Sequence, residues 1–248
     1  MIGRLLIVGA RVSALMLFAP FFAGATVAPH IKAGFALALT ALLYPVVGVN
    51  LPALSAATGW RVAGGEFVIG LMMGITLQFV FEGLELAGQV VSFQVGHSLA
   101  NLINPLSEAE TPILANFYQA VALLIFLQLN VHHWVLRGLA KSFQYCPPGM
   151  VVATPAAAGQ LWRAAGGMLI IAVQIAMPTL LATMIIDICM GFLGRASPQL
   201  PVMFVGMSVK SVVAFLVVMG TLRFWPGVLE KYFGEALAMS EQLMHLAR

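Results

Sequence analysis

Residues 82–112 read EGLELAGQVVSFQVGHSLANLINPLSEAETP, and here an otherwise apolar chain acquires a polar edge. If this segment and the turn before it are helical, at about 100° per residue, small and polar side chains share one narrow face. This polar stripe consists of Gln78, Glu82, Glu85, Gln89, Ser92 and Gly96. At ~1.5 Å per residue the stripe is roughly 27 Å long, close to the ~30 Å hydrocarbon thickness of a bilayer.

Charged groups at membrane depth are costly unless they face protein or a water-filled cavity. The polar stripe therefore predicts a helix that lines a pore or contacts another subunit. A solvated amphipathic connector would show the same pattern, so the sequence leaves that alternative open.

A non-helical loop is expected directly after the polar stripe. Its two prolines lack a backbone N–H and disfavour helix at the residue before each of them. The loop residues of interest are Leu99, Leu102, Ile103, Asn104, Pro105, Leu106 and Pro112. Most of these side chains are apolar, which suits either a constriction or ordinary loop packing.

The composition is that of an integral membrane protein. Of 248 residues, 61% are hydrophobic and only 8% are charged, against roughly a quarter charged in soluble domains. At ~20 residues a span, the length allows about six membrane spans. The net charge of +3 is spread along the chain without a basic run, so nucleic acid is not an expected partner.

The expected fold is an all-α polytopic membrane protein with long kinked helices, forming a single domain over residues 1–248. Arg11 interrupts the first apolar segment and argues against a cleaved signal peptide. The expected parts are N-terminal helices at 1–84, the striped helix and loop at 85–112, a helix and connector at 113–160, a helical hairpin at 161–225, and an amphipathic tail at 226–248.

Two further patterns indicate what individual helices contact. Gly64, Gly65, Gly70 and Gly74 give the helix before the polar stripe a small-residue surface suited to close helix contact. The tail alternates apolar and charged residues at helical spacing, which predicts a helix at the membrane surface or on a partner.

The hairpin carries one acid and one base inside apolar segments. Asp187 and Lys210 lie at similar distances from a turn that contains Pro198 and Pro201. An antiparallel hairpin would bring them to the same depth, so we predict an intramembrane ion pair. Proton coupling through Asp187 is the alternative.

Nothing in the chain has the pattern of an enzyme or a metal site. The HExxH, GxSxG and CxxC motifs are missing. His132 and His133 are adjacent, so their side chains should point about 100° apart and make a poor metal pair. We expect no catalytic residue, metal or cofactor. A secondary transporter that uses Asp187, Lys210 or Glu66 is a further alternative, although the chain shows no internal repeat.

Several short motifs, taken in their order along the chain, resemble those of the FliR family of flagellar export gates and its injectisome counterpart SctT. In the first helix and turn these residues are Arg11-Val12-Ser13, Phe18-Ala19-Pro20-Phe21-Phe22 and Lys32-Ala33-Gly34. In the centre they are Gly88-Gln89, Phe93-Gln94-Val95-Gly96, Ser98, Ala100, Pro105, Pro112, Phe117, Ala122, Leu124, Phe126-Leu127, Asn130, His132, Ser142-Phe143 and Pro147. The resemblance spans nearly the whole chain and is closer to the flagellar branch.

The resemblance implies a non-enzymatic subunit of the bacterial inner membrane and flagellar basal body. Such a subunit assembles with FliP-like and FliQ-like proteins into a channel, works with FlhB-like and FlhA-like export proteins, and passes unfolded proteins. It also implies that residues 99–112 help to plug the channel. His97 departs from the small or apolar residue expected before that loop, and either a pH-sensing role or an interior hydrogen bond would explain it.

Overall fold

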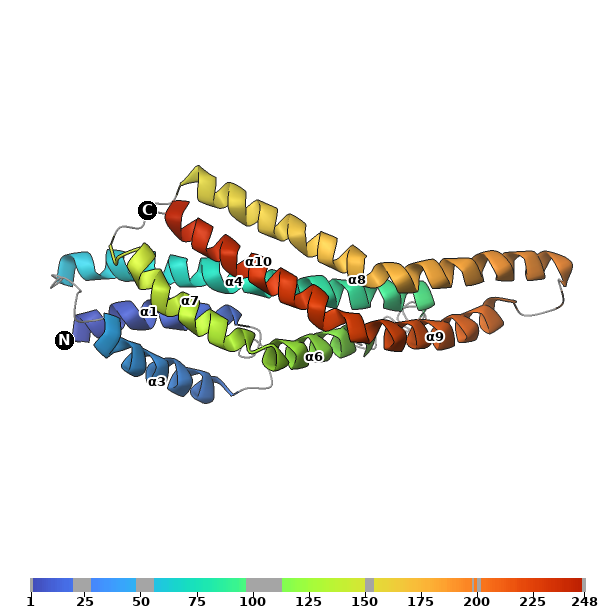
Figure 1. The fold of residues 1–248 in the computed structure, drawn as a ribbon, viewed down its shortest axis with the longest axis horizontal. Coiled ribbons are helices and arrows are strands. Elements are labelled where there is room, and N and C mark those ends of the chain that lie inside the picture. Colours follow the sequence, from blue (N-terminus) through green and yellow to red (C-terminus); the bar gives the residue numbers. More distant parts are fainter. Residues whose placement is uncertain are drawn as a thin grey trace. The chain divides into compact units, whose positions relative to one another are not determined.

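The computed structural model describes residues 2–19, 28–47, 56–96, 113–149, 154–197, 199 and 202–246, and within these ranges the chain is helical without strands (Figure 1). This confirms the all-α prediction. The helices are α1 (Ile2–Phe18), α3 (Pro29–Val47), α4 (Ala56–Val95), α6 (Ile113–Gln128), α7 (Val131–Tyr145), α8 (Pro155–Ala196), α9 (Val202–Thr221), the short 3₁₀ helix η2 (Leu222–Phe224) and α10 (Trp225–Leu246).

Three helical stretches of the described chain are long and apolar enough to cross a membrane. They are Gly59–Val95, Pro155–Ala196 and Phe204–Leu246, and a fourth span results if α6 and α7 count as one broken span. The six spans that the length allows are thus not reached within the described ranges.

The chain divides into two compact units. Unit 1 comprises Met1–Val80, Phe126–Gly167 and Lys231–Arg248, and unit 2 comprises Phe81–Ile125 and Met168–Glu230. The helices α4, α6, α8 and α10 each contribute residues to both units. The single domain and the segment boundaries expected from the sequence stay predictions. Helix α4 continues without a break from the preceding segment into the striped segment.

In unit 1, α1 packs closely against α4 through glycine. A Cβ atom on Gly70 would collide with the carbonyl oxygen of Arg11, and one on Gly74 would lie 2.7 Å from the Cβ of Phe18. The predicted small-residue surface is therefore confirmed at these two glycines. A Cβ on Gly64 would meet open space, so this glycine does not take part in that contact.

In unit 2, α4 uses two further glycines. A Cβ on Gly83 would lie 2.9 Å from the carbonyl oxygen of Met168 in α8, and one on Gly88 would lie 2.5 Å from the Cα of Ala115 in α6. Backbones that approach this closely leave no room for any other residue. The striped part of α4 is thus held against α6 and α8.

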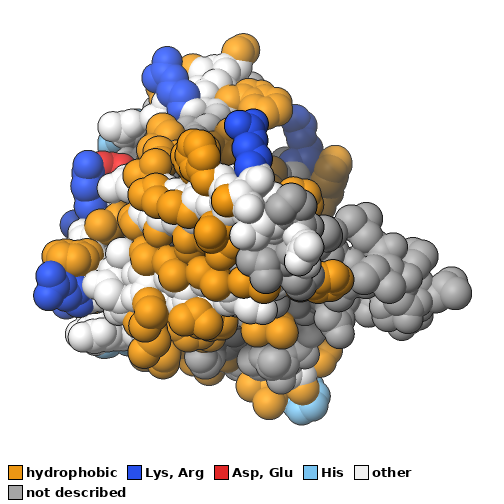
Figure 2. All heavy atoms as spheres, turned by 90° about the vertical axis from the view of Figure 1, so that its right-hand side faces the viewer, with side chains coloured by type: hydrophobic (Ala, Val, Ile, Leu, Met, Phe, Trp, Pro, Cys, Tyr) orange, Lys and Arg blue, Asp and Glu red, His pale blue; other side chains and the backbone are white. Residues whose placement is uncertain are grey.

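Unit 2 also exposes many large apolar side chains on α8 and α9. Examples on the helix surface are Ile185, Ile188 and Phe192 of α8 and Phe204 and Leu216 of α9. Figure 2 shows hydrophobic side chains over much of the face at the α8–α9 end. An apolar surface of this extent is typical of a protein that contacts lipid or other apolar subunits.

Two helix predictions need correction. The single helix expected at the start of the 113–160 segment is interrupted at Asn130, whose φ of 56° is left-handed. Asparagine tolerates this conformation better than most residues. The tail is a helix, α10, but its apolar side packs within the chain. Phe233 is buried, with its ring centroid 5.5 Å from that of Phe126, so this side of the helix is not free for a membrane surface or a partner.

Candidate functional site

Most of the polar stripe lies at the surface of α4. Glu82 and Glu85 are partly exposed and Gln89 is exposed. Leu84 and Ala87, each two residues after one of the acids and so about 200° around the helix from it, are fully buried. Gln89 Nε2 donates a hydrogen bond to Glu85 Oε1 at 3.2 Å.

The other stripe residues differ in exposure. Gln78 and Gly96 are partly exposed, like the two acids, whereas Ser92 is buried. The stripe therefore presents polar groups outward around Glu82, Glu85 and Gln89, as a pore wall or a subunit contact requires. Its role as either one stays a prediction.

Helix α4 ends in a glycine cap at the end of the stripe. Gly96 has a φ of 92°, and its N–H donates to the carbonyl oxygen of Phe93 at 3.1 Å. A left-handed residue at this position ends a helix, and glycine adopts it without strain. His97 and all of the predicted loop lie outside the described residues. These loop residues are Leu99, Leu102, Ile103, Asn104, Pro105, Leu106 and Pro112.

The structure brings Asp187 of α8 and Lys210 of α9 within ion-pair distance in unit 2. Gln94, near the end of α4, donates from Nε2 to Asp187 Oδ2 at 3.1 Å. The lysine is 17% exposed and the aspartate 45%, so the pair lies at the surface of the unit. Its intramembrane setting stays a prediction.

The sequence did not predict the contact of Gln94 with Asp187, because the hairpin geometry relates only α8 and α9. A signal was present, since Gln94 is a polar residue in the last turn of a largely apolar helix.

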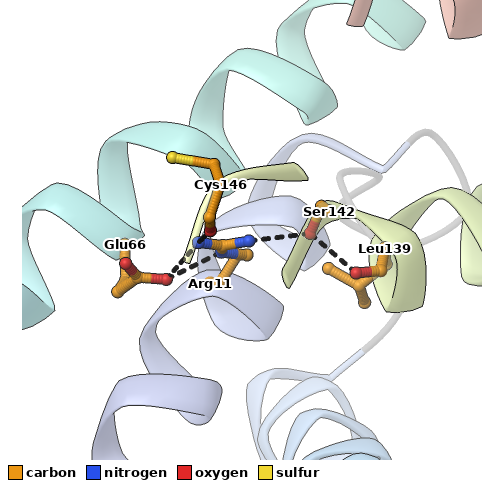
Figure 3. A network of polar contacts seen from close by, with 5 residues as sticks. All are labelled: Arg11, Glu66, Leu139, Ser142 and Cys146. Atoms are coloured by element: carbon orange, nitrogen blue, oxygen red, sulfur yellow. Dashed lines mark hydrogen bonds and ion pairs between the residues drawn. The ribbon is translucent and has the colours of Figure 1, made fainter. Parts of the chain in front are cut away.

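A second charged cluster lies in unit 1 and is fully buried (Figure 3). Arg11 of α1 donates from Nε to Glu66 Oε2 of α4 at 2.8 Å, and from one terminal nitrogen to Ser142 Oγ of α7 at 2.9 Å. Its other terminal nitrogen donates to the carbonyl oxygen of Cys146 at 3.0 Å. The guanidinium also lies 4.1 Å from the centroid of the Phe143 ring.

This cluster connects three helices through one guanidinium group. Both charged side chains are 0% exposed, and a buried charge is tolerated only when it is paired and hydrogen-bonded. Ser142 completes the arrangement by donating to the carbonyl oxygen of Leu139 at 2.7 Å. The cluster contains no nucleophile beside a general base, so the geometry indicates a structural role.

Sequence reasoning missed the pairing of Arg11 with Glu66. Each residue was noted alone, the arginine as an obstacle to a signal peptide and the glutamate as a transporter candidate. They are 55 residues apart, and no short turn relates their helices as one relates α8 to α9. The available signal was two opposite charges in two apolar segments.

Other candidate ligands do not converge in the described part of the chain. No group of three or more His, Cys, Asp or Glu side chains is arranged there to hold a metal ion. The rings of His132 and His133 lie closer than expected, with centroids 4.2 Å apart. Cys146 is buried, Cys189 is exposed, and both are free thiols.

Comparison with known proteins identifies the family. The model of the family described as bacterial export proteins, family 1, matches residues 2–236. The chain belongs to this family of bacterial export proteins. The match includes all three helices of the buried cluster and all but the last part of α10.

The relatives of this export protein are named as flagellar biosynthetic or secretion system proteins. The flagellar biosynthetic protein FliR of Bacillus subtilis is 30% identical over 215 residues, 85% of this chain and 83% of its own. FliR of Escherichia coli K12 is 30% identical over 197 residues, 79% and 75% of the two chains. The secretion system apparatus protein SsaT of Salmonella typhimurium is 26% identical over 173 residues, 69% and 66%. The predicted membership of the FliR family is thereby confirmed.

Proposed function

We propose that this export protein is a subunit of the flagellar type III export gate in the bacterial inner membrane. In this proposal it assembles with FliP-like and FliQ-like subunits into a channel, works with FlhB-like and FlhA-like proteins, and passes unfolded flagellar proteins. The observation that carries the proposal is the family match over residues 2–236, together with relatives named FliR. The injectisome role is the alternative, supported by SsaT at lower identity.

The polar stripe supports a role in passage. An unfolded chain in transit needs a polar wall without strong specific sites, because tight binding would trap it. The centre of the stripe is directed outward, and Glu85 and Gln89 bond to each other rather than converge on a pocket. In the assembled gate these side chains would line the channel or face a neighbouring subunit.

The loop after the polar stripe supports a role in closing the channel. Its apolar residues, Leu99, Leu102, Ile103 and Leu106, would form the constriction that excludes water and ions when no substrate is present. Gly96 ends α4 just before this loop, so the channel wall and the plug would be consecutive segments of one chain.

The exposed apolar surface supports assembly rather than a catalytic function. On α8, one open face around Pro178 consists almost entirely of apolar side chains: Leu169, Ile170, Val173, Met177 and Leu181. Surfaces of this kind suit packing against hydrophobic subunits or lipid. In this proposal the chain has no catalytic role, because its polar residues line the channel, pair with one another or stabilise the fold.

The proposal is tested by deleting the gene in its own bacterium and restoring it from a plasmid. We expect the deletion to abolish motility and the export of flagellar filament and hook proteins, and the plasmid to restore both. A motile deletion strain with normal flagellar export would refute the flagellar assignment. Loss of injectisome secretion in that strain would instead support the alternative.

A further inference from the structure

The ends of four helices lie together at one end of unit 1. The Thr154 hydroxyl, before α8, donates to the carbonyl oxygen of Leu246 at the end of α10, at 2.8 Å. At the same end, the ring centroids of Tyr145 in α7 and His245 in α10 are 5.1 Å apart. A Cβ on Gly149, just beyond α7, would lie 3.6 Å from Val62 in the first turns of α4. The starts of α4 and α8 therefore lie at the same end as the last residues of α7 and α10.

This end carries exposed tryptophan and basic side chains. Trp60 and Arg61 lie near the start of α4, Trp162 and Arg163 near the start of α8, and Lys141 near the end of α7; we call these five residues the basic–aromatic collar. The two tryptophans are 72% and 79% exposed, and the three basic side chains are also exposed. Because tryptophan is highly buried on average and is enriched at interfaces, two tryptophans this open favour a contact outside the chain.

The charge of the chain is divided unevenly between the units. Unit 1 contains nine Lys and Arg residues against three Asp and Glu, a net charge of +6, and its Arg11–Glu66 pair is buried. Unit 2 contains three basic and six acidic residues, a net charge of −3. The overall value of +3 conceals this asymmetry. The collar thus belongs to the part of the chain that attracts anions.

Two of the three helical stretches that are long and apolar enough to cross a membrane carry the collar tryptophans near their starts. Trp60 lies four residues after the first residue of α4, and Trp162 lies seven residues after the first residue of α8. Tryptophan is enriched where a span leaves the hydrocarbon core, because its ring is apolar and its N–H is polar. Arginine and lysine at the same level are attracted to anionic headgroups.

We propose that the basic–aromatic collar binds the headgroups of anionic phospholipids. The collar side chains come from three separate helices, α4, α7 and α8, and all are exposed, which suits several lipids better than one small ligand. An acidic protein segment would match the charge alone, whereas a lipid interface also accounts for both tryptophans. The inference does not depend on the export-gate proposal, because it concerns the chain in any membrane.

The test uses the full chain purified in mild detergent and titrated with phosphatidylglycerol or phosphatidylethanolamine, with bound lipid counted by native mass spectrometry. The collar variant is Arg61→Gln with Arg163→Gln. The matched control is Arg195→Gln with Arg223→Gln, which removes the same charge from two exposed arginines of unit 2. Thermal unfolding of both variants checks that they fold like the parent chain.

We expect the collar variant to weaken phosphatidylglycerol binding by about tenfold or more, from the contribution of each basic residue near an anionic surface. The control should bind like the parent chain, and phosphatidylethanolamine should bind weakly to all three. Equal loss in both variants, or no preference for phosphatidylglycerol in the parent chain, would overturn the proposal. Unchanged lipid binding with loss of a co-purifying acidic protein would overturn it in favour of a protein partner.

A second variant, Trp60→Leu with Trp162→Leu, separates the aromatic from the basic contribution. We expect it to lower retention of both lipids after washing while keeping the preference for the anionic headgroup. Retention equal to that of the parent chain would overturn the part of the proposal that assigns the tryptophans to lipid.

Discussion

Replacing Arg11 with methionine removes the guanidinium that holds α1, α4 and α7 together in unit 1. The Glu66 carboxylate then stays buried without its counter-ion, and two oxygens, Ser142 Oγ and the carbonyl of Cys146, lose a donor. Removal of one partner of a buried ion pair costs about 3–5 kcal/mol. The two further lost bonds are part of the same network and are not added separately.

A loss of this size is a large fraction of the ~5–15 kcal/mol that stabilises a typical domain. For a chain of this length it corresponds to a fall of roughly 6–20 °C in the unfolding temperature. The assay is thermal unfolding of the purified chain in mild detergent, followed by circular dichroism. Arg195→Met is the matched control, because that arginine is exposed and its loss should change the unfolding temperature by only about 2 °C or less.

The double variant Arg11→Met with Glu66→Met distinguishes pairing from simple loss of volume. Replacement of both charges by apolar groups of similar size is often neutral or stabilising, so most of the loss should be recovered. The reasoning is refuted if the single variant unfolds within about 2 °C of the parent chain. It is also refuted if the double variant is no more stable than the single one.

Three further predictions concern the gate itself. Leu102→Gly with Ile103→Gly should raise ion leakage across the membrane without loss of assembly, and unchanged conductance would remove these residues from the plug. Asp187→Lys and Lys210→Asp should each impair assembly, measured as the yield of intact complex, and the two together should restore it; no rescue would count against pairing. Gly88→Leu should prevent close contact of α4 with α6 and cost more than ~1–3 kcal/mol, measured as a lower unfolding temperature, and a parent-like value would contradict the observed packing.

The sequence predicted those parts of the fold that have a local or periodic cause. The low charge and long apolar runs predict an all-helical membrane protein. Helical spacing places the residues of the polar stripe on one face of a helix. The glycines at 70 and 74 indicated close packing, although their partner, α1, could not be read from the pattern.

Contacts between distant segments were the main part that the sequence did not predict. The pairing of Arg11 with Glu66 depends on how α1 meets α4, and helical periodicity within each segment contains no such information. In contrast, the short turn before α9 fixed the depth of Asp187 relative to Lys210, so their proximity could be predicted. The apolar side of α10 was assigned to a membrane or partner because a periodic pattern does not distinguish these from the chain's own core.

The break at Asn130 has a different cause. The flanking residues are apolar enough to continue one span, and no proline or glycine marks an end. The left-handed conformation of this single asparagine divides the span into α6 and α7. Because several residue types could occupy that position in an unbroken helix, the pattern of residues contains no decisive sign of the break.

The most direct test of the export-gate account is the native mass of the tagged chain extracted from its own membranes in mild detergent, with co-purifying polypeptides identified. The account predicts a large, discrete complex that contains several copies of small hydrophobic FliP-like and FliQ-like proteins. A monomer or small homo-oligomer that is stable without such partners would contradict it. That result would favour the transporter hypothesis and make Asp187 and Lys210 the first residues to test.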